Sequence, residues 1–278
     1  MSEEDTGEAF KMSDSHPLLL SRNNAARNRF GVLGVSVDAT QIFGVIQQIE
    51  TWVQHRDFCR FVAVTGMHGV MEAQHDAAFK AVLNSADLVV PDGMPLVWLG
   101  RLRGYRLPRR VYGPELMLTV CERTASTGAR HFFFGGAPGI PEKLTETLQS
   151  RYPGLNVVGA YSPPFRLLTP EEDEKVVAMI NAAAPDILWV GLSTPKQEKW
   201  MHAHRDRLRV PVLVGVGAAF DINSGMKQQA PVWMREHGME WFFRLLQEPQ
   251  RLWRRYIVLG SEFIFYVMLE LLGFRKSD

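Results

Sequence analysis

The sequence has few cysteines, almost no net charge and no long run of uncharged apolar residues, and each shortage excludes a class of protein. Its two cysteines, Cys59 and Cys121, have neither disulfide nor metal-ligand spacing, so we expect two core residues in a reducing compartment. A formal net charge of +1 argues against wholesale binding of nucleic acid, which requires a basic excess. Any basic function must therefore be local.

The chain also shows no segment typical of a signal peptide or a membrane-spanning helix. Residues 1–29 begin with acidic residues and continue into a stretch rich in Arg and Asn, so we predict a disordered N-terminal arm and a cytoplasmic protein. The apolar residues 258–274 include Glu262 and Glu270, so we expect this segment to lie on a bilayer rather than to cross it.

Short apolar runs alternate with segments of helical periodicity. The runs that predict strands cover residues 30–37, 61–64, 88–90, 131–134, 157–161, 187–190 and 212–216. The segments that predict helices cover residues 41–53, 69–83, 114–127, 141–152, 171–183 and 195–205. One of these helices has a clear start, with Thr169 as N-cap and Pro170 at the first helical position.

This alternation predicts an α/β fold, a Rossmann-like and mostly parallel sheet with helices on both faces. Strand signals cease near Glu240. We therefore expect a core over residues 30–240 and a helical C-terminal appendage over residues 241–278. Ligands on such a sheet bind beyond the carboxyl ends of the strands.

Two candidate catalytic residues stand at predicted strand ends. Asp92 follows the strand at 88–90 and is suited to act as a general base that takes a proton from an acceptor hydroxyl. The alternative that Asp92 only caps the next helix stays open. Thr65 follows the strand at 61–64 and is suited to orient an acceptor or a phosphate.

Nearby histidines do not predict a metal site. His68 and His75 stand seven residues apart, which is not the i, i+4 spacing of a zinc-binding helix. We expect both on a solvated helix face, and we expect no metal.

A glycine-rich turn follows the strand at 131–134. The backbone amides around Gly135 and Gly136 are suited to cradle phosphate. A nicotinamide-binding unit requires an acid at the end of the next strand, and this strand ends in Tyr161. The missing acid counts against a dehydrogenase, whereas Tyr161 or Phe165 is suited to stack on a nucleobase or to pack locally.

The segment around Thr194 predicts a second phosphate site. Thr194 as N-cap and Gln197 at the third helical position form the pattern of a capping box, and the free helix amides with Lys196 would hold a diphosphate. Asp221 ends the next strand, where it is suited to bind ribose or base or, alternatively, to cap a loop.

The run at residues 241–256 mixes arginines with large apolar groups. Trp253 and Tyr256 would offer an apolar face to a membrane, while the arginines present forked donors to phosphate. These arginines are Arg244, Arg251, Arg254 and Arg255.

Four ordered motifs, at residues 89–93, 190–198, 215–221 and 240–256, closely resemble the WecG/TagA/CpsF family of bacterial glycosyltransferases. The resemblance implies an inverting, metal-independent transfer of a hexose, an N-acetylhexosamine or its uronic acid from a UDP-sugar to a polyprenyl-diphosphate-linked saccharide. It further implies cell-surface polysaccharide synthesis, with exopolysaccharide favoured over teichoic acid, and a peripheral enzyme at the inner face of the membrane that can form a homo-oligomer. No cofactor is implied.

The resemblance also assigns residues by position. Asp92 matches the family's catalytic base and Thr65 its neighbouring threonine, while Gln197 and Asp221 match donor-binding positions. Three appendage arginines match those that reach the diphosphate of donor or lipid, namely Arg244, Arg251 and Arg254.

Two departures from the family pattern leave the donor sugar open. Met67 and Pro95 stand where the family often has Asn and Gly, so a sugar contact differs there. Two other classes of function also stay open at this point, a nucleotide-dependent oxidoreductase and a non-catalytic scaffold that docks through its C-terminal helix.

Overall fold

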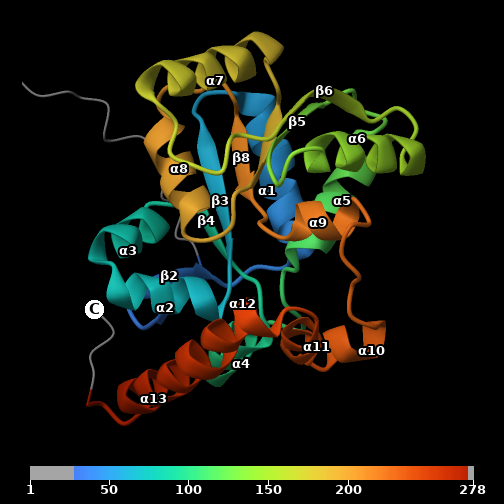
Figure 1. Ribbon diagram of the computed structural model, residues 1–278. Helices are drawn as coiled ribbons and strands as arrows, with labels where there is room; N and C mark the ends of the chain where they lie inside the picture. Colours follow the sequence, from blue (N-terminus) through green and yellow to red (C-terminus); the bar gives the residue numbers. More distant parts are fainter. Residues whose placement is uncertain (1–27, 275–278) are drawn as a thin grey trace, which may run out of the picture.

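The computed structural model describes residues 28–274 (Figure 1). The disordered arm expected for residues 1–29 lies outside this range except for Asn28 and Arg29, and Arg29 already begins a strand. None of the helices within residues 28–274 combines the length and apolar character that crossing a membrane requires.

A six-stranded sheet forms the centre of the molecule and confirms the predicted α/β class. Its strands lie in the order β4-β3-β8-β7-β5-β6, and every neighbouring pair is parallel. The strands are β3 (Arg60–Thr65), β4 (Leu88–Pro91), β5 (Arg130–Gly135), β6 (Asn156–Tyr161), β7 (Ile187–Gly191) and β8 (Val212–Gly215). Because all six run in one direction, their carboxyl ends lie along one edge, which faces the C-terminal helices at the bottom of Figure 1.

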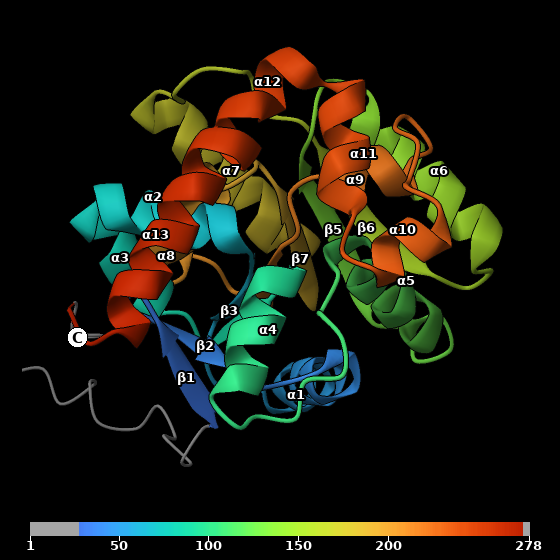
Figure 2. The same cartoon turned by 90° about the horizontal axis from the view of Figure 1, so that it is seen from below.

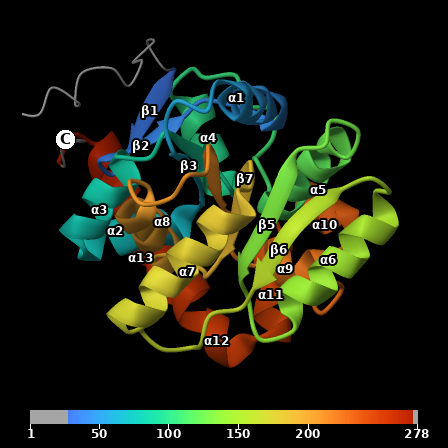
Figure 3. The ribbon, with the colours of Figure 1, turned by 90° about the horizontal axis from the view of Figure 1, so that it is seen from above.

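Helices cover both faces of this sheet, as Figure 3 shows from above. One face carries α1 (Ile42–His55), α5 (Gly113–Thr124), α6 (Ile140–Arg151) and α9 (Ala219–Asn223). The other face carries α2 (Met67–His75), α3 (Ala77–Asn84), α7 (Pro170–Ala183) and α8 (Lys196–His204). The predicted capping box at the start of α7 is confirmed, with both reciprocal bonds between Thr169 and Glu172 present.

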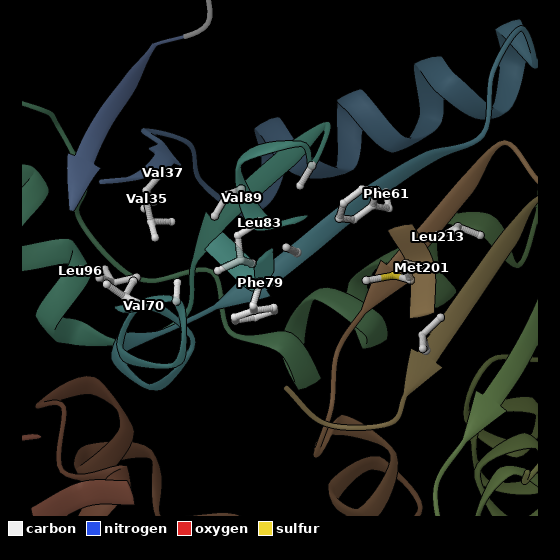
Figure 4. Close-up of a cluster of buried hydrophobic side chains, with 14 of the residues drawn as sticks. Val35, Val37, Phe61, Val70, Phe79, Leu83, Val89, Leu96, Met201 and Leu213 are labelled. Carbon is white, nitrogen blue, oxygen red and sulfur yellow. The ribbon is translucent and has the colours of Figure 1, made fainter. Parts of the chain in front are cut away.

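The core beneath α2, α3 and α8 joins side chains from distant parts of the chain (Figure 4). Phe61 and Leu213 come from neighbouring strands, Phe79 from α3 and Met201 from α8, and all four are fully buried. Strands buried on both faces read as continuous apolar runs, which is why the sheet was visible in the sequence.

Residues 30–37 form two strands, and the single strand expected there is wrong. β1 (Arg29–Val32) and β2 (Val35–Asp38) pair as an antiparallel hairpin apart from the main sheet. The turn between them holds Leu33 and Gly34 at φ 51° and 76°, the left-handed pair that a two-residue hairpin turn needs. Leucine seldom occupies the first position of such a turn, so the apolar run at residues 30–37 did not predict it.

The single helix expected at residues 69–83 is also wrong. The chain breaks at Asp76, whose carboxylate accepts a hydrogen bond of 3.0 Å from the backbone N–H of Phe79 and so begins α3. A capping aspartate between two short helical stretches is a start signal within an otherwise continuous periodicity.

The C-terminal helices lie across the carboxyl edge of the sheet, together with α4 (Met94–Leu102) (Figure 2). They are α10 (Val232–Glu236), α11 (Glu240–Gln247), α12 (Pro249–Trp253), the π-helical segment η2 (Arg254–Val258) and α13 (Leu259–Leu271). α13 also packs on α2.

One buried polar network joins α5 to the neighbouring strands β5 and β7. The indole of Trp189 donates a hydrogen bond of 3.0 Å to Nδ1 of His131, and Nε2 of His131 lies 2.8 Å from Oγ1 of Thr124. An indole N–H can only donate, so Nδ1 is the acceptor and the proton sits on Nε2. Burial lowers the pKa of His131 to about 4, which keeps this imidazole neutral at pH 7.

We predict that Trp189→Phe lowers the free energy of unfolding more than Trp200→Phe does. Both changes remove an indole ring, but only Trp189 donates a hydrogen bond, since the buried Nε1 of Trp200 has no partner among the described residues. An orphaned acceptor on His131 costs about 1–3 kcal/mol beyond the lost packing. Urea denaturation at pH 7 measures both variants, and equal losses would show that the network contributes nothing.

Candidate active site

A cavity of about 600 Å³ lies where the C-terminal helices meet the ends of β3 and β4. Its lining contains both polar and apolar side chains. The polar lining includes His68, Asp92, Arg110, Tyr112, Thr194, Glu240, Arg244 and Arg255. The apolar lining includes Met94, Trp98, Leu99, Ile257, Phe263, Ile264, Val267 and Met268, most of them from α4 and α13.

Asp92 follows β4 directly and lies in the wall of this cavity. Its backbone N–H donates a 2.7 Å hydrogen bond to the carbonyl of Thr65, which extends the pairing of the two strands. Gly93 occupies the N-cap of α4 with no side-chain bond, so the alternative that Asp92 caps this helix is wrong. The carboxylate is 29% exposed, accepts no hydrogen bond from a described residue, and has Nη1 of Arg110 at 3.9 Å.

This environment makes Asp92 more basic than an ordinary aspartate. Burial raises the pKa of Asp92 to about 6 against the attraction of Arg110; Glu240 adds to the rise, and Arg244 and Arg255 oppose it. A carboxylate with such a pKa is ionised at pH 7 and still accepts a proton readily, as a general base must.

Two arginines of the C-terminal helices reach the cavity, Arg244 from α11 and Arg255 from η2. The guanidinium of Arg255 is largely buried, its Nε has no hydrogen-bond partner, and no described carboxylate pairs with it. Burial lowers its pKa. An unpaired buried cation in a cavity wall is a site for an anionic ligand.

The other two arginines expected at the diphosphate lie outside the cavity lining. Arg251 is 55% exposed and pairs with Glu248, and Arg254 is exposed. The wider turn of η2 changes which side chain faces inward, because its hydrogen bonds join residues five apart rather than four. The sequence carries no signal of this π-helical turn. Arg255 was one of four arginines expected to offer donors to phosphate, but the resemblance matched only Arg244, Arg251 and Arg254 to the diphosphate.

His68 is not on a solvated face, so that expectation is wrong for this residue. Its side chain is 15% exposed, lines the cavity and lies 3.2 Å from Glu72. Burial lowers the pKa of His68 to about 3, with a further contribution from Arg255, so the imidazole is neutral. His75 is 50% exposed, as expected, and contacts Glu262 at 2.7 Å.

Thr65 ends β3 as predicted but lies behind the cavity wall. Its side chain is 1% exposed, its hydroxyl has no hydrogen-bond partner, and it packs closely against Gly69. Thr65 therefore supports the wall beside Asp92.

The capping box expected at Thr194 and Gln197 is wrong. α8 begins at Lys196 after a cis Thr194–Pro195 bond, and no side chain caps it. The buried carboxylate of Glu198 accepts hydrogen bonds from the hydroxyl of Thr194 at 2.8 Å and from the side-chain amide of Gln197 at 3.0 Å. The side-chain oxygen of Gln197 accepts a hydrogen bond from the backbone N–H of Gly217 at 3.0 Å, which fixes the loop after β8.

The remaining donor-binding candidates lie outside the cavity lining: Gly135 and Gly136 at the end of β5, Tyr161 at the end of β6, Lys196 at the start of α8, and Asp221 within α9 rather than at a strand end. Gly135 has φ 122°, and a Cβ there would meet the backbone of Gly191 at 2.6 Å. Gly136 has φ 75°. Tyr161 stacks on a core phenylalanine, Lys196 lies 5.1 Å from the ring of Phe165, and Asp221 pairs with Lys227 at 2.8 Å.

Sequence reasoning missed three cavity residues that bind one another. Arg110 pairs with Glu240, the hydroxyl of Tyr112 donates to Glu240 at 2.9 Å, and the guanidinium of Arg110 stacks 4.2 Å from the Tyr112 ring. No local pattern connects residues so far apart in the chain. Glu240 is the first residue of the motif at residues 240–256, and this was the only sequence signal for any of the three residues.

Met67 and Pro95, the two departures from the family pattern, both line the cavity. Their position means that a change of side chain there alters the space available to a ligand. Across residues 28–274, no three side chains of His, Cys, Asp or Glu gather where they would hold a metal ion.

Comparison with known proteins identifies the family. The model of the glycosyl transferase WecG/TagA/CpsF family matches residues 30–277. Similar proteins from Bacillus spizizenii and Staphylococcus aureus (strain MW2) are each 30% identical, over 78% and 84% of this chain and 82% and 89% of their own length. Both are named N-acetylglucosaminyldiphosphoundecaprenol N-acetyl-beta-D-mannosaminyltransferase. The chain therefore belongs to the WecG/TagA/CpsF family and is a glycosyltransferase.

Proposed function

We propose that the enzyme transfers an N-acetylhexosamine, with inversion and without a metal ion, from a UDP-sugar to a saccharide on a polyprenyl diphosphate. The observation that carries this proposal is the unbonded carboxylate of Asp92, which shares one cavity with Arg244 and Arg255. The names of the relatives support N-acetylmannosamine as the sugar and a lipid-linked N-acetylglucosamine as the acceptor. The product would serve cell-surface polysaccharide, with exopolysaccharide the expectation from sequence.

In this mechanism Asp92 takes the proton of the acceptor hydroxyl. The freed oxygen forms a bond to the anomeric carbon of the donor while the bond from that carbon to the diphosphate breaks, and UDP leaves with the electron pair. Arg244 and Arg255 stabilise the negative charge that develops on the diphosphate. A single displacement of this kind inverts the anomeric configuration.

The apolar part of the cavity lining supports a lipid-linked acceptor. α4 and α13 supply side chains such as Trp98 and Ile264, and the same cavity is lined by the arginines. A polyprenyl chain against these apolar side chains would place its diphosphate in the cavity that holds the arginines. The oxidoreductase and scaffold alternatives are set aside, since the family consists of glycosyl transferases.

The enzyme would reach its lipid substrate from the membrane surface. Phe265 in α13 and Leu272 directly after it are 57% and 65% exposed, and Leu102 at the end of α4 is 64% exposed. Large exposed apolar groups on the two helices that supply apolar side chains to the cavity suit insertion into the interface of a bilayer.

We predict that Asp92→Asn lowers kcat by at least about 100-fold, because the amide cannot take up the acceptor proton. In the wild type, kcat/KM should rise with pH up to about 6, as Asp92 ionises, and then level off. The rates are measured as transfer of radiolabelled N-acetylmannosamine from its UDP-sugar to the lipid-linked acceptor. Near wild-type turnover by a folded variant would remove Asp92 as the base.

Thermal denaturation shows whether the lower kcat of Asp92→Asn is due to misfolding. The pKa of Asp92 in the folded state lies above its ordinary value of 3.8, so its ionisation destabilises the fold progressively from about pH 4 and fully above pH 6. Asn carries no charge, and the variant should therefore melt at or above the wild-type temperature at pH 7.

Arg255→Ala should weaken UDP binding by about 10-fold to 100-fold, the effect of losing a charge-assisted hydrogen bond. Arg254→Ala is the matched control, because it removes the same charge from the neighbouring position outside the cavity. Titration calorimetry with UDP measures both, and equal effects would contradict the assignment of Arg255 to the diphosphate.

Phe265→Glu should weaken binding to anionic lipid vesicles about 10-fold or more, since an inserted phenylalanine contributes about 1.5–3 kcal/mol. Phe43→Glu is its control, because Phe43 is 65% exposed on the distant α1. Vesicle sedimentation reads the result. If the two variants bind equally, α13 is not the membrane-facing element.

A further inference from the structure

Arg110 lies between two carboxylates and binds only one of them. Its Nη2 pairs with Oε2 of Glu240, while its Nη1 stays 3.9 Å from Oδ1 of Asp92. Hydrogen bonds of this kind are about 2.7–3.2 Å long, so the contact with Asp92 is not one. Both carboxylates could therefore pair with the Arg110 guanidinium, but only Glu240 does so.

The surroundings of Glu240 hold its carboxylate in contact with Arg110. Its Oε1 accepts the hydroxyl of Tyr112 at 2.9 Å, and its side chain is 7% exposed. The Arg110 guanidinium stacks on the ring of the same tyrosine. Tyr112 thus fixes both partners, and rotation of Arg110 towards Asp92 requires breaking a buried ion pair.

We propose that Glu240 is a positioning residue that withholds Arg110 from Asp92, so that the Asp92 carboxylate stays free to accept a proton. The inference rests on the proposed role of Asp92 as base. A carboxylate in a hydrogen-bonded ion pair with arginine is a weaker base, because the pair favours the charged form. Glu240 is also the first residue of α11, so docking of this helix would set the reactivity of the base.

Other charged or titratable groups also line the cavity that holds Asp92. Arg244 comes from α11, Arg255 and Tyr256 from η2, and His68 from α2. None of them is bonded to Glu240 or Arg110. Replacing Glu240 therefore changes the partner of Arg110 and leaves these groups in place.

The test is Glu240→Gln, which keeps the shape of the side chain and removes its charge. The pKa of Asp92, followed through the ¹³C shift of its carboxyl group, should fall by about one unit or more, the effect of a newly formed pair with arginine. The acid limb of kcat/KM should move to lower pH by the same amount, with a lower plateau. An unchanged carboxyl pKa would overturn the proposal.

A second variant separates the action through Arg110 from the direct field of Glu240. In an Arg110→Gln background, Glu240→Gln should shift the Asp92 pKa by less than half as much as it does alone. Equal shifts in both backgrounds would show that Glu240 acts directly, which contradicts the proposal.

If Glu240→Gln does not fold, Tyr112→Phe gives the same reading. It removes the hydroxyl that holds Glu240, and it should lower the Asp92 pKa in the same direction; no change would overturn the proposal. The NMR titration requires no turnover. If the wild type transfers no sugar, the proposed function is contradicted. The Asp92 carboxyl pKa in the variant tests the role of Glu240 separately.

Discussion

The structure around the cavity depends on an aspartate that is partly buried and carries its charge without a hydrogen-bond partner among the described residues. Asp92 reaches this position because β4 ends there and its backbone pairs with β3, so the sheet fixes the carboxylate without binding it. Burial makes the charge unfavourable, and three arginines keep it tolerable without a direct hydrogen bond. The Asp92 carboxylate is therefore ionised at pH 7 and is still more basic than an ordinary aspartate.

The C-terminal helices complete this environment rather than merely covering it. Glu240 and Arg244 come from α11 and Arg255 from η2, while α13 supplies much of the apolar wall. The same helices carry the exposed apolar side chains proposed to meet the bilayer. Contact with the membrane and assembly of the charged cluster would then depend on one group of helices.

The sheet and the position of Asp92 followed from the sequence, because buried strands are continuous apolar runs and their ends are where ligands bind. The charged cluster did not follow. Arg110 and Glu240 meet across 130 positions of the chain, and Arg255 faces inward because of a π-helical turn. Thr194 and Gln197 match a local capping pattern, but the buried Glu198 binds both side chains. Predictions from local sequence patterns fail where a charged side chain that is buried or distant in the chain binds the groups of the pattern.

The proposed reaction is a single displacement at the anomeric carbon, assisted by Asp92 and the arginines. The most direct measurement is the anomeric configuration of the product formed from UDP-N-acetyl-α-mannosamine and a lipid diphosphate N-acetylglucosamine, determined by NMR, with EDTA present. Inversion without a metal ion gives a β-linked disaccharide lipid in undiminished yield. An α-linked product, or transfer that stops when EDTA is added, would contradict it.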